Sequence, residues 1–249
     1  MPCRFEGAPL ADPTAAEEVA AAEAADAVAD VVHTHVSKPL LPLVPAGAVR
    51  VLDVGCGCGN FGEQLKREHP GCYVVGVTLS EAEARRAVGR LDEVFLGDMN
   101  VLDLTFLPLF DVVVCSHALG YFTDTEAFLR RLCTLMVPNG TLLLTVPNVV
   151  NFKERWQFLR GRFRYQNRGV LDRFYVRFFD RESLRAAVSE AGFQITHWHD
   201  KGYLPQPLLR RAAPRLTGFF DACAVRLSPG LFGQFFHLAA RPSSVPPSE

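Results

Sequence analysis

Short apolar runs and amphipathic segments alternate along the chain from residue 49 onward. Runs rich in Val, Leu and Phe predict five buried strands, at 49–54, 72–77, 92–96, 110–115 and 141–146. Apolar residues at helical spacing predict the helices between them, near 59–69, 80–90 and 124–137. Buried strands that alternate with helices are typical of a parallel sheet covered on both faces. The pattern therefore predicts an α/β fold.

The pattern changes after Pro147. Residues 150–179 form a basic, aromatic insertion, and nine Lys and Arg stand against three acids over 150–181. The elements expected beyond it are a helix from Asp180 to a stop at Gly192, strands at 193–199 and 232–241, and a helix at 206–227. The last helix is apolar on one side, which suits packing against the core, a second copy or a membrane surface.

Three parts of the chain are expected. Residues 1–45 would form an acidic helix and a Pro-rich connector, residues 46–241 the main domain, and residues 242–249 a flexible tail. Within the domain, Thr123-x-x-Glu126 predicts a capping box for the helix near 124–137. Pro138-Asn139-Gly140 predicts the turn that ends this helix.

Composition narrows the class of protein. The 249 residues are 49% hydrophobic with a net charge of −1, which supplies a real core and argues against nucleic acid as a partner. Seven scattered cysteines, an odd number, suit reduced thiols in a cytoplasmic setting. Cys56-x-Cys58 is too closely spaced for a usual zinc site, so no metal is expected. No apolar run reaches membrane-spanning length, so no transmembrane segment is expected either.

The glycine-rich stretch "VLDVGCGCGNFGEQL" at 51–65 follows the first predicted strand. Glycines at such a strand end let the backbone turn sharply and approach a ligand closely. One frame, Gly57-x-Gly59-x-x-Gly62, matches the dinucleotide fingerprint. That interpretation is weakened because the second strand ends in Thr78 instead of an acid, and because Asp53 would repel a pyrophosphate.

The other frame resembles motif I of class I S-adenosylmethionine (SAM) dependent methyltransferases. Asp53-x-Gly55-x-Gly57-x-Gly59 places an acid and three glycines after an apolar strand, as that motif does. The resemblance covers about residues 45–148. It implies a three-layer, Rossmann-like sheet of seven strands, mostly parallel with an antiparallel last strand. It also implies SAM as the cofactor.

The resemblance assigns cofactor contacts by position. It implies that the loop, including Cys56, holds the methionyl part of SAM, with Asp53 orienting it. "GVTLS" resembles the cyclopropane fatty-acid synthase branch, which implies that Thr78 and Glu83 share the ribose. Glu83 also suits a helix N-terminus without any ligand. Further contacts are implied for the residues after the third and fourth strands: Asp98, Met99 and Cys115.

The insertion resembles a MetW-like subgroup often linked to glycan biosynthesis. "GRFRYQNRG", "LDR", "RFFDRESL" and "EAGF" match its pattern, whereas Tyr175 stands where that pattern has His. Arginine forks suit phosphate or carboxylate groups and aromatic faces suit sugars, although a solvated basic face would have the same composition. The candidate substrate-binding residues are Tyr121, Tyr165, Arg168, Arg173 and Arg177.

Methyl transfer to a hydroxyl benefits from a general base. His117, at the end of the fourth strand, is the first candidate, and Tyr175 is a second residue that could orient the acceptor. The sequence thus predicts O-methylation of a sugar-containing or small anionic acceptor, by a chain that could form a homodimer. The alternative is an accessory SAM-binding subunit of the MetW type in methionine biosynthesis.

Overall fold

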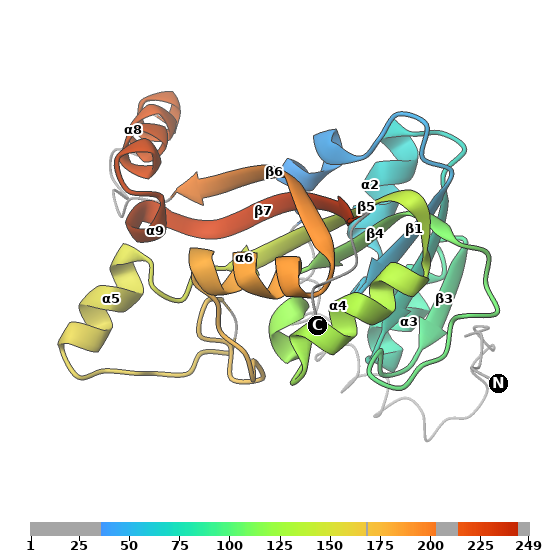
Figure 1. The fold of residues 1–249 in the computed structure, drawn as a ribbon, viewed down its shortest axis with the longest axis horizontal. Helices are drawn as coiled ribbons and strands as arrows, with labels where there is room; N and C mark the ends of the chain where they lie inside the picture. The colour runs from blue at the N-terminus through green and yellow to red at the C-terminus, as the bar shows by residue number, and fades with distance from the viewer. Residues whose placement is uncertain (1–35, 168, 203–213, 244–249) are drawn as a thin grey trace, which may run out of the picture. The chain divides into compact units, whose positions relative to one another are not determined.

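The computed structural model describes residues 36–167, 169–202 and 214–243 (Figure 1). The helix expected within 1–45, the first part of the helix expected at 206–227, Arg168 and most of the tail lie outside the described residues. The described residues hold a seven-stranded sheet in the order β3-β2-β1-β4-β5-β7-β6. The strands are β1 (Arg50–Val54), β2 (Tyr73–Thr78), β3 (Glu93–Leu96), β4 (Phe110–Ser116), β5 (Met136–Pro147), β6 (Phe193–Gly202) and β7 (Gly233–Pro242).

The pairing confirms the predicted α/β class. β1 pairs with β2 and β4 in parallel, and β2 pairs with β3 in parallel, whereas β6 and β7 are antiparallel. β1, β2 and β4 are buried along nearly their whole length, as the continuous apolar runs predict for strands covered on both faces.

Helices fall between the strands at the predicted places. Those that the hydrophobic pattern predicts are α2 (Asn60–Glu68), α3 (Glu81–Ala87), α4 (Thr125–Thr134), α6 (Arg181–Glu190) and α8 (Pro214–Leu227). Four short elements were not predicted: η1 (Lys38–Leu43), η2 (Leu119–Tyr121), α5 (Phe152–Leu159) and α9 (Pro229–Phe232). The predicted cap of α6 is confirmed, because Asp180 and Ser183 form a capping box there.

The described chain divides into two compact units. The first unit holds the residues up to Ser116 together with Leu132–Leu142, and the second holds His117–Arg131 together with the residues from Leu143 on. In the first unit, α2 and α3 pack on β2. In the second, α6, α8 and α9 pack on β6.

The start and the end of α4 differ from the prediction. The helix begins at Thr125, and Asp124 caps it by accepting the Ala127 N–H at 2.8 Å, so the predicted cap at Thr123 is wrong. The carbonyl of Thr123 instead accepts a hydrogen bond from Arg177, 54 residues later. At the other end, β5 already begins at Met136, so the predicted turn at 138–140 lies within a strand. Pro138 is tolerated there because it is exposed at the strand's beginning, where no ladder donor is needed.

Helix α5 lies within the predicted basic, aromatic insertion, for which no helix was predicted. Asn151 caps it, because its side chain accepts the N–H groups of Lys153 and Glu154 at 3.0 and 3.3 Å. Its apolar residues Phe152 and Trp156 are exposed.

Candidate cofactor and acceptor site

The glycine loop joins β1 to α2 in the first unit. Gly55, Gly57 and Gly59 have φ of 72°, 54° and 78°, in the left-handed region that favours glycine. The N–H groups of Gly55 and Cys56 both donate to the carbonyl of Val77, at 2.9 and 3.0 Å. The loop is thus tied to the end of the neighbouring strand β2.

Asp53 lies at the end of β1, two residues before the loop. Its side chain is 2% exposed, and its Oδ2 is buried with no hydrogen-bond partner among the described residues. Burial raises the pKa of Asp53 from 3.8 to about 7. A buried carboxylate without a partner is costly unless a cation or a donor meets it. The position therefore suits a ligand that brings a positive charge.

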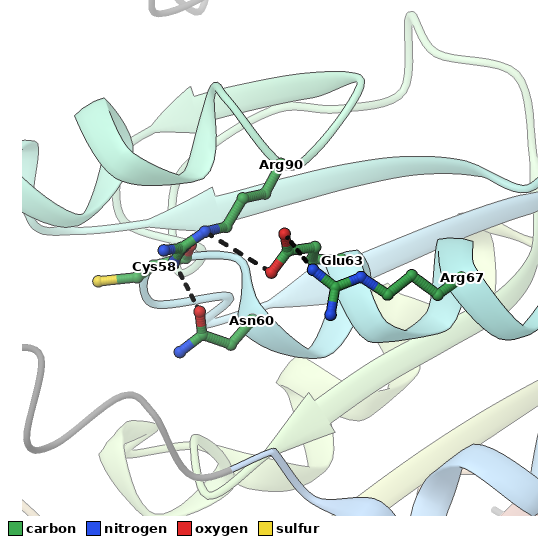
Figure 2. Close-up of polar contacts among 5 residues, drawn as sticks. All are labelled: Cys58, Asn60, Glu63, Arg67 and Arg90. Carbon is green, nitrogen blue, oxygen red and sulfur yellow. Dashed lines mark hydrogen bonds and ion pairs between the residues drawn. The ribbon is translucent and has the colours of Figure 1, made fainter.

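Arg90, in the turn after α3, holds the outer side of the same loop (Figure 2). Its guanidinium donates to the carbonyl of Cys58 at 2.7 Å and to Asn60 Oδ1 at 2.6 Å. Its Nε lies 3.8 Å from Glu63, which also pairs with Arg67 at 2.8 Å. The role of Arg90 was not predicted, because no local pattern links an arginine to a loop about 30 residues earlier.

The structure brings Thr78 and Glu83 together. The Thr78 hydroxyl donates to Glu83 Oε2 at 2.5 Å, across the turn from β2 to α3. Ser80 between them caps α3, since its hydroxyl accepts the Glu83 N–H. Glu83 thus lies both in the first turn of a helix and beside the end of β2, and both interpretations of its role remain physically sound.

The remaining predicted cofactor residues lie just after β3 and at the carboxyl end of β4. Asp98 Oδ1 accepts the backbone N–H and the side-chain amide of Asn100, each at 2.8 Å, which is ordinary turn chemistry. Met99 and Cys115 are buried. All ten predicted cofactor residues therefore belong to the first unit, at or just after the carboxyl ends of β1 to β4.

His117 opens the second unit, directly after β4. It is the one non-glycine residue of the described chain with a positive φ, at 60°. Its N–H donates to the carbonyl of Thr145 at 2.8 Å, and its carbonyl accepts from the Tyr175 hydroxyl at 2.9 Å. Its ring stands edge-on to Phe235, with centroids 5.1 Å apart. A left-handed conformation held from both sides stores strain of the kind that is concentrated at functional sites.

Tyr175 is buried against η2. The backbone N–H groups of Val176 and Arg177 donate to the carbonyl of Gly120, at 2.9 and 3.1 Å. The Tyr175 ring also lies against Tyr121, with centroids 4.7 Å apart. The insertion thus packs closely on η2, and the Tyr175 hydroxyl is directed at the backbone of His117.

The other predicted substrate residues within the described ranges each make contacts of their own. Tyr165 is 61% exposed, next to Phe163. The side chain of Arg173 contacts that of Asn167. Arg177 is used within the unit, because its Nε donates to the Thr123 carbonyl at 2.8 Å and its guanidinium lies 4.0 Å from Glu126.

Two buried polar contacts in the second unit were missed by the sequence analysis. Thr145 Oγ1 lies 3.0 Å from Nδ1 of His237, and both side chains are buried. Asn148 is fully buried and donates to the carbonyls of Gly230 and Gly233, at 3.0 and 2.7 Å. Partners more than 80 residues apart leave no local signal in the sequence.

Gly120→Ala is expected to destabilise the second unit. A Cβ there would lie 2.9 Å from the Tyr175 ring and 3.0 Å from the Arg177 carbonyl, so the ring or the backbone must shift. We expect a loss of about 1–3 kcal/mol in the free energy of unfolding, measured by urea denaturation. Gly218→Ala in α8, where a Cβ meets nothing within 4 Å, is the control and should not destabilise. Equal stability of the two variants would contradict the close packing described.

The sheet order, together with a glycine loop after β1 preceded by a buried acid, defines the class I SAM-dependent methyltransferases. Residues 16–198 match the sequence profile of the family described as "Methyltransferase domain", and the chain belongs to this family. The chain therefore contains a SAM-dependent methyltransferase domain, and SAM is the cofactor of this domain. The left-handed glycines and the orphan Oδ2 of Asp53 fit this cofactor, which carries an ammonium group at its methionyl end.

Named relatives support this assignment. The chain is 30% identical to the malonyl-[acyl-carrier protein] O-methyltransferase of Geobacter sulfurreducens, over 68% of this chain and 66% of that protein. It is 33% identical to the trans-aconitate 2-methyltransferase of Variovorax paradoxus, over 46% of this chain and 45% of that protein. The chain thus spans just under two thirds of the first relative and about half of the second.

Solved structures show the same fold. A SAM-dependent methyltransferase from Archaeoglobus fulgidus superposes with a TM-score of 0.57 at 20% identity, over 86% of this chain and 94% of that one. The putative methyltransferase in complex with the Trm112 activator of Haloferax volcanii has a TM-score of 0.62 at 19% identity, over 94% of this chain and 100% of that one. None of the helices in the described ranges is long and apolar enough to cross a membrane.

Proposed function

We propose that this chain methylates a hydroxyl oxygen of a sugar-containing or small anionic acceptor. The observation that carries the proposal is His117, an imidazole on a strained backbone that is held at both its N–H and its carbonyl. Chain continuity puts it directly after β4, one of the four strands whose ends carry the predicted cofactor residues. An imidazole titrates near neutral pH and can accept a hydroxyl proton.

In this proposal the first unit binds SAM. The loop glycines and Asp53 hold its methionyl end, and Asp53 as a carboxylate pairs with the ammonium group. Thr78 and Glu83 hold the ribose hydroxyls, and Asp98 and Met99 meet the adenine. Cys56 belongs to the loop at the methionyl end, and Cys115 lines the methyl-donor side; both are buried.

The protein has to contribute little activation of the methyl group. SAM supplies a methyl group that its sulfonium has already activated, so alignment and the exclusion of water provide much of the acceleration. His117 accepts the proton of the acceptor hydroxyl as the oxygen attacks, a role worth about 10²–10⁴ in rate. The Tyr175 hydroxyl keeps the His117 carbonyl in place, which makes Tyr175 a positioning residue.

The acceptor class rests on the insertion. Its motifs resemble those of the MetW-like subgroup linked to glycan biosynthesis, and relatives such as the nocamycin O-methyltransferase of Saccharothrix syringae are named for oxygen methylation. Tyr165 and Arg173 are exposed and offer an aromatic face and a cation to a phosphorylated or carboxylated sugar. Arg177 supports this region through η2 and α4.

Turnover separates the proposal from its alternative. The chain is incubated with SAM and a set of sugar phosphates, nucleotide sugars and sugar acids, and S-adenosylhomocysteine is measured. We expect product with one of these groups and none without an acceptor. Tight SAM binding without turnover on any of them would favour an accessory SAM-binding subunit of the MetW type.

Glu83→Ala tests the ribose contact. Loss of a charged hydrogen-bond partner should weaken SAM binding about 5–30-fold in calorimetry. The matched control is Glu81→Ala, which removes another carboxylate from the first turn of α3. If both variants change the affinity equally, or Glu83→Ala changes it less than about twofold, Glu83 serves only the helix N-terminus.

A further inference from the structure

The second unit exposes many large apolar side chains. Of the eighteen large apolar side chains that are exposed in the described chain, eleven lie in residues 150–179 and 214–232. We call the described part of these two segments the cationic–aromatic surface. On α5, Phe152, Trp156 and Leu159 recur at intervals of four and three residues, which puts them on one side of the helix.

Helix α8 presents a second apolar stripe. Leu216, Phe219, Phe220 and Leu227 are exposed at intervals of three, one and seven residues. The two helices are linked by α9, which directly follows α8 in the chain and whose Phe232 ring lies 6.2 Å from that of Phe152. Figure 1 shows α5, α9 and α8 along the same end of this unit.

The exposed charged side chains of this surface are all positive. Its described residues carry nine Lys and Arg side chains, and all nine are exposed. Its three acidic side chains are turned inward: Glu154, Asp172 and Asp221 are only 1%, 6% and 9% exposed. Two of the cations have a nearby carboxylate, Lys153 at 3.3 Å from Glu154 and Arg177 at 4.0 Å from Glu126.

We propose that the cationic–aromatic surface binds the surface of an anionic lipid membrane. Aromatic and aliphatic side chains on helical stripes, mixed with exposed cations, are the composition of an interfacial helix that lies in the headgroup region. An isologous contact with a second copy is disfavoured, because it would bring like charges against like charges. Leu159 and Leu227 have no face to stack on nucleic-acid bases but partition into acyl chains.

The proposal goes beyond methyl transfer and holds whichever acceptor is used. It gives the chain a position at a membrane surface, peripheral and without a spanning helix in the described residues. The surface lies wholly within the second unit, so the binding does not depend on how the two units are arranged.

Vesicle binding tests the proposal with the full chain. Vesicles of roughly one third phosphatidylglycerol and two thirds phosphatidylcholine should carry the protein in flotation, and pure phosphatidylcholine vesicles should carry far less. Arg160→Glu with Arg162→Glu should lower the partition coefficient at least about tenfold. Trp156→Ala with Leu159→Ala should lower it by a similar factor. In a Trp198→Phe background, Trp156 emission should shift to shorter wavelength on binding.

Two control variants make the same kinds of substitution outside the cationic–aromatic surface. Arg130→Glu with Arg241→Glu alters the net charge equally outside the surface, and Leu79→Ala with Val101→Ala removes exposed apolar groups of the first unit. Both should bind vesicles like the parent chain. Absence of binding to anionic vesicles overturns the proposal, as does equal loss in the control variants. Self-association or nucleic-acid binding that the surface variants abolish, with no vesicle binding, also overturns it.

Discussion

Asp53→Asn is expected to stabilise the SAM-free protein while it weakens SAM binding. Burial raises the pKa of Asp53 from 3.8 to about 7, so the folded state holds this proton over a range in which the unfolded chain has released it. Stability is therefore lost as pH rises from about 4 to about 7, and the loss is complete above that pH. A difference of about three pKa units corresponds to up to about 4 kcal/mol. The asparagine variant should recover much of this at pH 8.

The same substitution removes the charge that the ammonium group of SAM would meet. Affinity for SAM should fall at least about thirtyfold, because the buried ammonium group of SAM would lose the Asp53 carboxylate as its partner. Urea denaturation between pH 4 and 8, together with calorimetry, measures both effects. Asp111→Asn is the matched control: Asp111 accepts the N–H groups of Val49 and Arg50 at 2.9 and 2.8 Å, so its variant should lose stability. A stabilised Asp53 variant with unchanged SAM affinity would remove Asp53 from the cofactor site.

His117→Ala is expected to lower kcat by about 10²–10⁴ and to leave the Kd for SAM within about twofold. The reason is that His117 acts on the acceptor, whereas the predicted SAM contacts belong to the first unit. Loss of SAM affinity with unchanged turnover at saturation would refute the general-base role.

His117→Gly separates the side chain from the backbone strain. Both variants lack the imidazole, but only glycine adopts the φ of 60° without cost, so Gly should be more stable than Ala by about 1 kcal/mol. Their kcat values should be equally low. Tyr175→Phe removes the hydrogen bond to the His117 carbonyl and should lower kcat without removing the His117 ionisation from the pH–rate profile. A profile that loses this ionisation would make Tyr175 more than a positioning residue.

Local patterns predicted most of the fold and the glycine loop after β1. The strands were found because their apolar runs are continuous. The loop was found because Asp53 and the three left-handed glycines occupy every second position from 53 to 59. Thr78 and Glu83 were likewise expected to act together, and one turn does bring them into contact. Errors arose where a distant residue competes for a local group, as at Thr123, whose carbonyl binds Arg177.

The amino-acid sequence by itself determined the α/β class, the family and the residues that follow each parallel strand, because strand and turn propensities act over a few neighbouring residues. Only the tertiary structure decided that Arg90 holds the glycine loop, that the His117 backbone is held by Thr145 and Tyr175, and that the acids of the insertion are buried while its cations are exposed. These features depend on contacts between residues about 30 to 60 positions apart and on which side of each helix is covered. A local pattern along the chain encodes neither the distant contacts nor the side of a helix that is covered.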